Sequence, residues 1–364
     1  MTSFYVRDAL GDQPGRPGTG AFSTCPDIIP AGVTPAPDPA QFTTAAGYAT
    51  DYGGPVFLNQ ANFVYLRALS TGAPPANGRA WLYYTDSALA LWPSQWRSDG
   101  IEVAGNPVNY QPVSATAQDQ VCVTDLPFVW TPAPLPGNDH HCMIGWFENN
   151  PSNPPTSPVA GLGNFTSFEQ LLTFILDNPH MGWRNVVEVS KLGPTWSQTS
   201  AITGPTPAAP FVIGVEGNNL PTDAGFSFMV PGPTPGIAPV IMPSGGGWVP
   251  ISSPNFQDTV KVTDWPAGAR SSITVNFKQG ATVPPAGSSL TVVLSVPAAT
   301  LGASVADRVR KDRPDLVKRS QPEPPARSLR PGAPARGGGR EPGGDRGQTA
   351  PTEHVTIGAV TYRF

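Results

Sequence analysis

Proline and glycine constrain this chain more than any other feature of its sequence. The chain has 46 prolines and 39 glycines among 364 residues, about twice the usual combined share of ~12%. Proline breaks helices and is confined mainly to the edges of sheets, while glycine favours turns. Charged residues make up 13% of the chain, about half the usual ~25%. These features exclude coiled coils and helical bundles as the main architecture and predict an all-β protein.

The apolar segments are short, rich in aromatic and β-branched residues, and separated by turn residues. These properties are typical of strands. The clearest such segments are 62–69, 79–85, 141–147, 183–189, 211–215, 226–230, 258–262, 272–277 and 290–296. Their spacing predicts two antiparallel β-sandwich domains of the immunoglobulin-like kind.

A change in composition marks each expected domain boundary. We expect the first domain at residues 1–190, a Pro/Gly-rich linker at 191–210, and the second domain at 211–302 plus 353–364. Residues 303–352 are rich in Pro, Gly and Arg and have few large apolar side chains. Such a segment cannot bury enough surface to offset the entropy of ordering. It is therefore predicted to be a long disordered insert within the second domain.

One short helix is expected in the first domain, at residues 167–177. Thr166 and Glu169 have the spacing of a capping box. The following apolar residues recur at helical spacing, at Leu171, Leu172, Ile175 and Leu176. Pro179 then ends the helix.

Four segments of the first domain resemble the strands of CARDB-like and related immunoglobulin-like modules. These segments are Asn62–Gly72, Arg79–Asp86, His141–Trp146 and Asn178–Val186. The resemblance covers about residues 62–190 and departs from the family pattern at Ser70, at Pro179-His180, and in the inserted helix at 167–177. The resemblance implies a non-catalytic adhesive or accessory β-sandwich.

The net charge of −4 is distributed unevenly. Residues 307–346 contain eleven Lys/Arg and six Asp/Glu, which leaves the rest of the chain with a net charge of −9. An acidic body repels nucleic acid and anionic membranes. The candidate contacts to a polyanion are therefore Arg327, Arg330, Arg336, Arg340 and Arg346. Since no aromatic residue accompanies them to stack on bases, a solvated spacer is favoured and nucleic acid is not an expected partner.

No pattern of catalytic residues is found in the sequence. A P-loop, a GxGxxG fingerprint and a GxSxG elbow are all missing. Asp139 and His141 could share one face of a strand, but a zinc site needs three or four protein ligands. We therefore predict no catalytic residue, no cofactor and no metal, with Asp139 and His141 as weak metal candidates only.

Neither a membrane span nor a signal peptide is visible. No apolar run approaches ~18 residues, and the N-terminal residues lack a basic region followed by an apolar stretch. The expectation is a cytoplasmic protein, or one exported by a signal-independent route. Cys25, Cys122 and Cys142 are then expected to be buried free thiols, with a Cys122–Cys142 bridge as the alternative.

Tryptophans in Pro/Gly-rich loops are the best candidates for binding residues. Trp92 and Trp96 are the first choice, and Trp248 is included with them. Loop tryptophans can stack on sugars or anchor protein interfaces, but they can also pack the ends of a sandwich. The predicted function is a non-catalytic structural or interaction protein, an accessory component of a larger assembly with a protein partner. The alternatives are a carbohydrate-binding module and an effector with an unrecognised enzymatic site.

Overall fold

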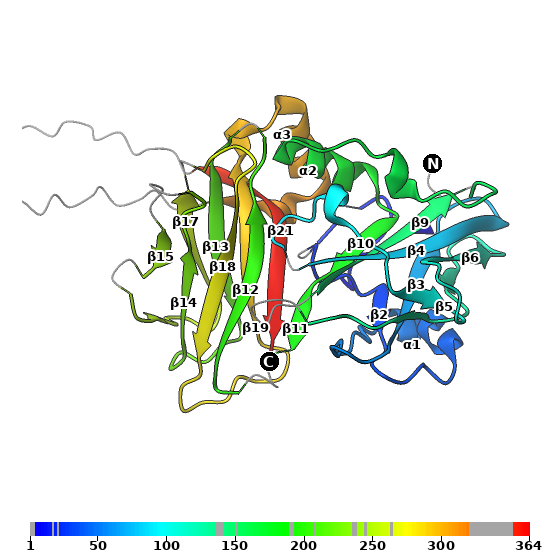
Figure 1. Cartoon of the computed structure of the whole chain (residues 1–364), viewed down its shortest axis with the longest axis horizontal. Helices are drawn as coiled ribbons and strands as arrows, with labels where there is room; N and C mark the ends of the chain where they lie inside the picture. The colour runs from blue at the N-terminus through cyan, green and yellow to red at the C-terminus, as the bar shows by residue number, and fades with distance from the viewer. Residues whose placement is uncertain are drawn as a thin grey trace, which may run out of the picture.

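The protein folds mainly into β-sheets. The computed structural model describes residues 4–16, 18–19, 22–86, 88–134, 141–149, 151–188, 193–206, 208–234, 239–243, 246–262, 265–319 and 352–364. In these residues the strands form four sheets, which build two sandwiches that lie side by side (Figure 1). The α-helices are α1 (Ala45–Tyr48), α2 (Phe168–Asp177) and α3 (Ala303–Asp312). The predicted class, all-β with two antiparallel sandwiches, is confirmed, and the first sandwich has the four-residue helix α1 in addition to the expected helix α2.

The first sandwich has two antiparallel sheets. One sheet has the order β1 (Phe4–Tyr5), β3 (Asn62–Ser70), β8 (Phe128–Trp130), β5 (Ile101–Val103), and β3 also pairs with β2 (Ile28–Pro30) and β7 (Val121–Val123). The other sheet has the order β10 (Met181–Arg184), β9 (His141–Asn149), β4 (Ala76–Asp86), β6 (Tyr110–Ala115). A core between them contains Leu66 of β3, Leu82 of β4 and Phe147 of β9.

The second sandwich also has two sheets. One has the order β11 (Val186–Glu188), β21 (Glu353–Arg363), β19 (Ser289–Pro297), β13 (Phe211–Asn218), β17 (Phe256–Val262), and β20 (Val317–Arg319) pairs with β21. The other has the order β12 (Thr195–Thr203), β18 (Arg270–Lys278), β14 (Gly225–Val230), β15 (Val240–Met242), and β16 (Val249–Pro250) pairs with β14. Every pairing here is antiparallel except that of β11 with β21.

The chain passes directly from one sandwich into the other at Asn185. Strand β10 lies in the first sandwich, and β11, which starts at the next residue, pairs with the end of β21 in the second. The Asn185 side chain donates a hydrogen bond to the carbonyl of Ala359. A single apolar cluster continues across this seam, from Leu171 of α2 to Phe211 of β13. The two sandwiches therefore share part of one core.

The expectation that residues 191–210 are a linker needs correction. This segment contains β12, which pairs with β18 along its whole length. Four alternate residues of β12 point into the core. Trp196 and Ile202 are apolar, but Gln198 and Ser200 are polar. The apolar alternation that predicts a strand is therefore weak here.

The expectation that residues 303–352 are disordered is wrong for the first part of the segment. Residues 303–312 form α3, and Pro314–Leu316 form a 3-10 helix that leads into β20. Val309 and Leu316 are buried in the core that spans the seam, and Arg308 forms an ion pair with Asp177 of α2. A few well-placed apolar residues and one interhelical ion pair thus hold this segment. Residues 320–351 lie outside the described residues.

Helix α2 begins one residue later than the sequence predicted. Ser167, not Thr166, is the N-cap, and it forms a capping box with Gln170, not Glu169. The same Gln170 amide oxygen accepts hydrogen bonds from the backbone N–H and the hydroxyl of Thr166. Both residue pairs have the required spacing, so the sequence alone could not separate the two registers.

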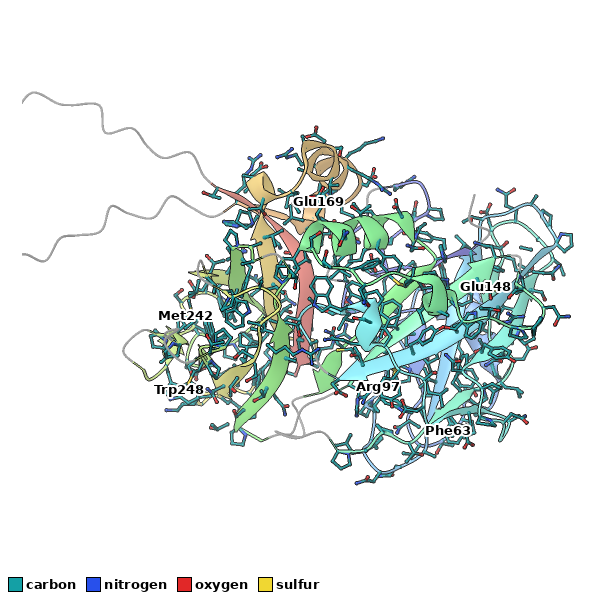
Figure 2. All side chains as sticks on the ribbon, turned by 45° about the horizontal axis from the view of Figure 1, so that its top comes forward. Phe63, Arg97, Glu148, Glu169, Met242 and Trp248 are labelled. Carbon is teal, nitrogen blue, oxygen red and sulfur yellow. The ribbon has the colours of Figure 1, made fainter. Side chains whose placement is uncertain are left out.

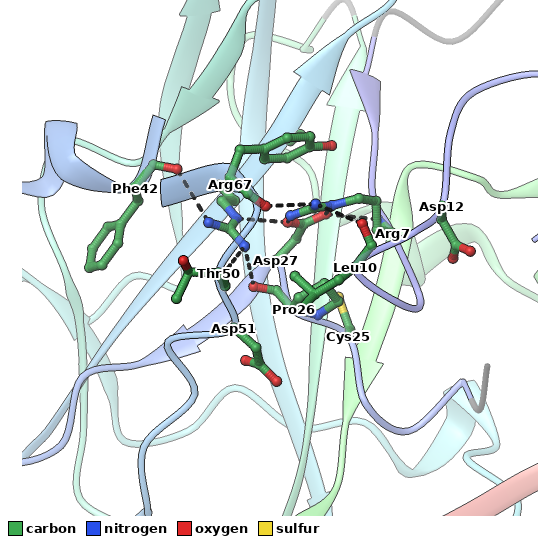
Figure 3. Close-up of polar contacts among 12 residues, drawn as sticks. Arg7, Leu10, Asp12, Cys25, Pro26, Asp27, Phe42, Thr50, Asp51 and Arg67 are labelled. Atoms are coloured by element: carbon green, nitrogen blue, oxygen red, sulfur yellow. Dashed lines mark hydrogen bonds and ion pairs between the residues drawn. The ribbon is translucent and has the colours of Figure 1, made fainter. Parts of the chain in front are cut away.

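Three charged side chains are buried together between β3 and the N-terminal segment, residues 4–55 (Figure 3). The Asp27 carboxylate binds the Arg7 guanidinium at 2.6 Å and the Arg67 guanidinium at 2.7 Å. Arg67 also donates to four backbone carbonyls, those of Pro26, Phe42, Gly47 and Thr50. The Arg7 guanidinium lies 3.4 Å from the centre of the Tyr48 ring. Nearly every donor of the two arginines thus has a partner, which a buried charge requires.

Replacing Asp27 should destabilise the protein strongly, because Asp27→Ala leaves two buried guanidinium groups without their carboxylate. We expect the free energy of unfolding to fall by about 3–5 kcal/mol, measured by chemical denaturation. The control is Asp86→Ala, which breaks the exposed Arg97–Asp86 ion pair and should cost less than about 1 kcal/mol. Equal losses in the two variants would contradict a stabilising role for the buried cluster.

Candidate functional site

Trp92 and Trp96 are core residues and not surface residues. Their exposed fractions are 5% and 9%. The Trp92 ring stacks on Phe168 of α2, and its indole N–H donates to the carbonyl of Thr203. The Trp96 ring packs against Phe174 of α2, and its indole N–H donates to the carbonyl of Leu91. Since no ring face is open to a ligand, the first-choice binding residues instead join α2 to the core.

Trp248 lies at the surface, with 38% of its area exposed. Its side chain lies beside Gly225 at the start of β14, because a Cβ atom at that glycine would lie 3.4 Å from the Trp248 Cβ atom and 4.0 Å from its ring atom Cε3. Figure 2 shows Trp248 and Met242 at the same end of the second sandwich. Of the three tryptophans chosen from the sequence, Trp248 alone could contact a partner without rearrangement.

Two further exposed apolar residues lie on the same sheet face as Trp248. Met229 of β14 and Ile241 of β15 are directly opposite each other in the antiparallel pairing, with exposed fractions of 42% and 39%. Met229 follows Gly225 by four residues, a distance of about 13 Å along a strand. Neither residue was among the candidates from the sequence, although the alternation with buried Phe226 and Phe228 places Met229 on the outer face.

The rest of this face is polar but almost uncharged. We call it the outer sheet face, meaning the solvent side of β12, β18, β14 and β15. The outward positions between Arg270 and Lys278 on β18 are small and polar. Most of the outward positions beside them are also small and polar, apart from Ala201 and Met229, and the polar set is Ser197, Thr199, Ser227, Ser272, Thr274 and Asn276. The Thr199 and Thr274 hydroxyls are 3.0 Å apart, and Asn276 donates to Ser227.

Of the two metal candidates, the structure describes only His141. Asp139 lies outside the described residues. A ring nitrogen of His141 is 3.0 Å from the carbonyl oxygen of Ala133, and its ring packs edge-on against Trp130. In the part of the chain that the structure describes, no group of three or more His, Cys, Asp or Glu side chains could hold a metal ion. Likewise, none of the described helices is long and apolar enough to cross a membrane.

The remaining sequence candidates have two different outcomes. Arg327, Arg330, Arg336, Arg340 and Arg346 lie outside the described residues, so their role as polyanion contacts stays a prediction. Cys25, Cys122 and Cys142 are buried free thiols, as expected, and the alternative Cys122–Cys142 bridge is not formed. Burial raises the pKa of the Cys122 thiol to about 12, which keeps it protonated and unreactive.

A cavity of about 740 Å³ opens at the seam between the sandwiches, and we call it the seam cavity. Its walls come from the N-terminal segment, from α2 and β10, and from the end of α3. The apolar side chains in the wall include Phe22, Ile175, Leu176, Met181 and Trp183. The volume is within the usual range of small-molecule sites, ~300–1,000 Å³.

Charged residues surround one part of the seam cavity. Asp8 pairs with Arg313, the residue between α3 and the following 3-10 helix, and Arg313 also pairs with Asp315. The pKa of Asp8 is raised to about 7, mainly by burial and also by Asp12 and Asp315, while Arg313 acts in the opposite direction. The desolvation of Asp8 thus outweighs its ion pair. Since Asp8 pairs with Arg313, the N-terminal segment is attached to the second sandwich as well as to the first.

Comparisons with known proteins give little beyond this geometry. No family model matches the chain, and no curated protein matches it. Similar solved structures include a serine-rich repeat protein from Streptococcus agalactiae, with 8% identity, a TM-score of 0.18, and coverage of 67% of this chain and 83% of that chain. The collagen adhesin of S. aureus has 8% identity, a TM-score of 0.16, and coverage of 65% and 81%.

A red sea bream transglutaminase is also similar, with 10% identity, a TM-score of 0.15, and coverage of 66% of this chain. This chain spans only 27% of that transglutaminase. TM-scores this low carry no argument about function, so the function has to be argued from the surface of the molecule. The resemblance of residues 62–190 to CARDB-like modules stays a prediction.

Trp92→Ala should destabilise the protein, because it removes a buried ring between α2 and the core. We expect a loss of about 3–5 kcal/mol in the free energy of unfolding, measured by denaturant titration. Trp248→Ala is the matched control and should stay within about 0.5 kcal/mol of the wild type. If Trp92→Ala were as stable as the control, its burial would be in doubt.

Asp8→Asn should change how stability depends on pH. The folded state holds the Asp8 proton up to a pKa of about 7, whereas the unfolded chain releases it near ~3.9. Between these values the wild type therefore loses stability as pH rises, by at most about 1.4 kcal/mol per pH unit, and the variant lacks this loss. Denaturation of both proteins from pH 4 to 7 should show a growing advantage of Asp8→Asn, and a constant difference would contradict the raised pKa.

Proposed function

We propose that this chain is a non-catalytic interaction protein, an accessory component of a larger assembly, and that it binds a protein partner through the outer sheet face. The observation that carries the proposal is the position of Trp248, Met229 and Ile241 on one face of one sheet. Exposed apolar residues that gather on one surface commonly mark contact sites.

The composition of the outer sheet face supports a protein partner. The centre of a protein interface is depleted in charged residues and enriched in Trp and Met. On this face the charged residues of β18 lie only at the two ends of the strand, at Arg270 and Lys278. Between them the face offers hydroxyl and amide groups beside an apolar edge, which can bury against a partner without leaving a charge unpaired.

The rigidity of the body supports an accessory role. The shared core and the buried Arg7–Asp27–Arg67 cluster hold both sandwiches and the N-terminal segment in one arrangement. A preformed surface loses little conformational entropy when it binds. Such a body is suited to presenting a fixed contact surface within an assembly.

A carbohydrate ligand is the second candidate, and one observation favours it. The exposed Trp248 ring is on the same face as the Asn276–Ser227 pair, so an aromatic surface and hydrogen-bonding groups are available together. Aromatic rings can stack on sugars, while amides and hydroxyls bond to their hydroxyl groups. A glycan array with the wild type and Trp248→Ala separates this candidate from the first one.

The proposal is tested with the triple variant Met229→Ser, Ile241→Ser, Trp248→Ala. Affinity isolation from native extract should lose the partner that the wild type retains, because an interface of this kind depends on a few apolar anchors. Thermal unfolding should be nearly unchanged, since all three residues are exposed.

The matched control is Val33→Ser with Leu126→Ser, which removes two exposed apolar residues of the first sandwich. The control should keep the partner. If the triple variant kept the same partner as the wild type, the outer sheet face would not be the contact surface. Binding to a glycan that Trp248→Ala abolishes would favour the second candidate.

A further inference from the structure

We propose that the seam cavity is a binding site for an organic anion with an apolar body, such as a medium-chain carboxylate. This site is separate from the outer sheet face and does not rest on the proposed function. Three features of the cavity support the proposal: its apolar wall, the charges at its rim and its place between the two sandwiches.

The apolar wall suits an elongated apolar group. Phe22 and Trp183 lie with their ring centres 5.1 Å apart, and Ile175, Leu176 and Met181 contribute aliphatic and thioether surface. Apolar ligands gain about 25 cal/mol for each Å² of apolar surface that they remove from water. An alkyl or aryl body that contacts this wall would therefore gain free energy from the apolar surface that it covers.

The charges at the rim of the cavity favour an anionic group at the polar end of the ligand. Asp8 and Arg313 compensate each other, and Asp312 pairs with Arg308. Two lining cations remain, Arg16 and Lys311, and neither forms an ion pair among the residues that the structure describes. The charged lining residues, three cations and two carboxylates, therefore have a net charge of +1, although the chain as a whole has a net charge of −4.

These two cations come from different parts of the chain. Arg16 belongs to the N-terminal segment, and Lys311 belongs to the last turn of α3. Near them, the backbone N–H of Gly18 donates to the carbonyl of Asp312, and the Arg313 side chain packs on Gly18. This contact places a cation from each element beside the same cavity. A carboxylate between the two would link the N-terminal segment to the second sandwich.

The test compares three ligands with the same eight-carbon tail: octanoate, octan-1-ol and octylammonium. Binding to the full chain is measured by isothermal titration calorimetry. We expect octanoate to bind about tenfold more tightly than octan-1-ol, the effect of two partly screened ion pairs, and octylammonium to bind most weakly. Added salt should weaken octanoate binding and leave octan-1-ol unchanged.

The double variant Arg16→Ala, Lys311→Ala tests whether these two cations bind the carboxylate of the ligand. Both side chains are exposed, so the fold should be unaffected. Octanoate affinity should fall about tenfold, to that of octan-1-ol, and octan-1-ol affinity should not change. The matched control Arg270→Ala, Lys278→Ala removes two exposed cations of the outer sheet face and should bind octanoate like the wild type.

Three results would overturn the proposal. They are an absence of octanoate binding at millimolar concentration, equal affinities for the three ligands, and unchanged octanoate affinity in the double variant. None of these results bears on partner binding by the outer sheet face, so the two proposals can fail separately.

Discussion

The structure depends on one buried carboxylate, that of Asp27. It binds the guanidinium groups of Arg7 and Arg67, and all three side chains are almost fully buried. Burying these charges is costly unless each one is paired and hydrogen-bonded, so the N-terminal segment has to adopt the path that completes the pairing. Without the N-terminal segment, the Arg67 side chain on the central strand β3 would lack its carboxylate partner and its carbonyl partners.

Further carboxylates of the N-terminal segment connect the two sandwiches. Asp51 binds Arg184 of β10 in the first sandwich and Arg363 of β21 in the second, and these arginines lower the pKa of Asp51 despite its burial. Asp8 forms the corresponding contact with Arg313. Together with the shared apolar cluster, these ion pairs make the seam a packed interface, and the seam cavity lies beside it.

The sequence predicted the repetitive features of the fold well and the long-range contacts poorly. Strands rich in aromatic and β-branched residues and the short helix α2 followed from local patterns, whereas the three free thiols were expected because no signal peptide was visible. The strand β12 was missed because polar residues alternate with apolar ones on its buried side, at Gln198 and Ser200. Among the loop tryptophans, the sequence could not distinguish the buried Trp92 from the exposed Trp248, because burial depends on which element packs above the loop.

The amino-acid sequence by itself determined the all-β class, since a chain so rich in proline and glycine and so poor in charge favours short strands and turns over long helices. Only the tertiary structure decided that Arg7, Asp27 and Arg67 form one buried cluster, because no local pattern relates residues so far apart in the chain. The same holds for the outer sheet face and the seam cavity. Each is defined by strands and helices that meet in space, and their surfaces come from side chains that the packing leaves uncovered.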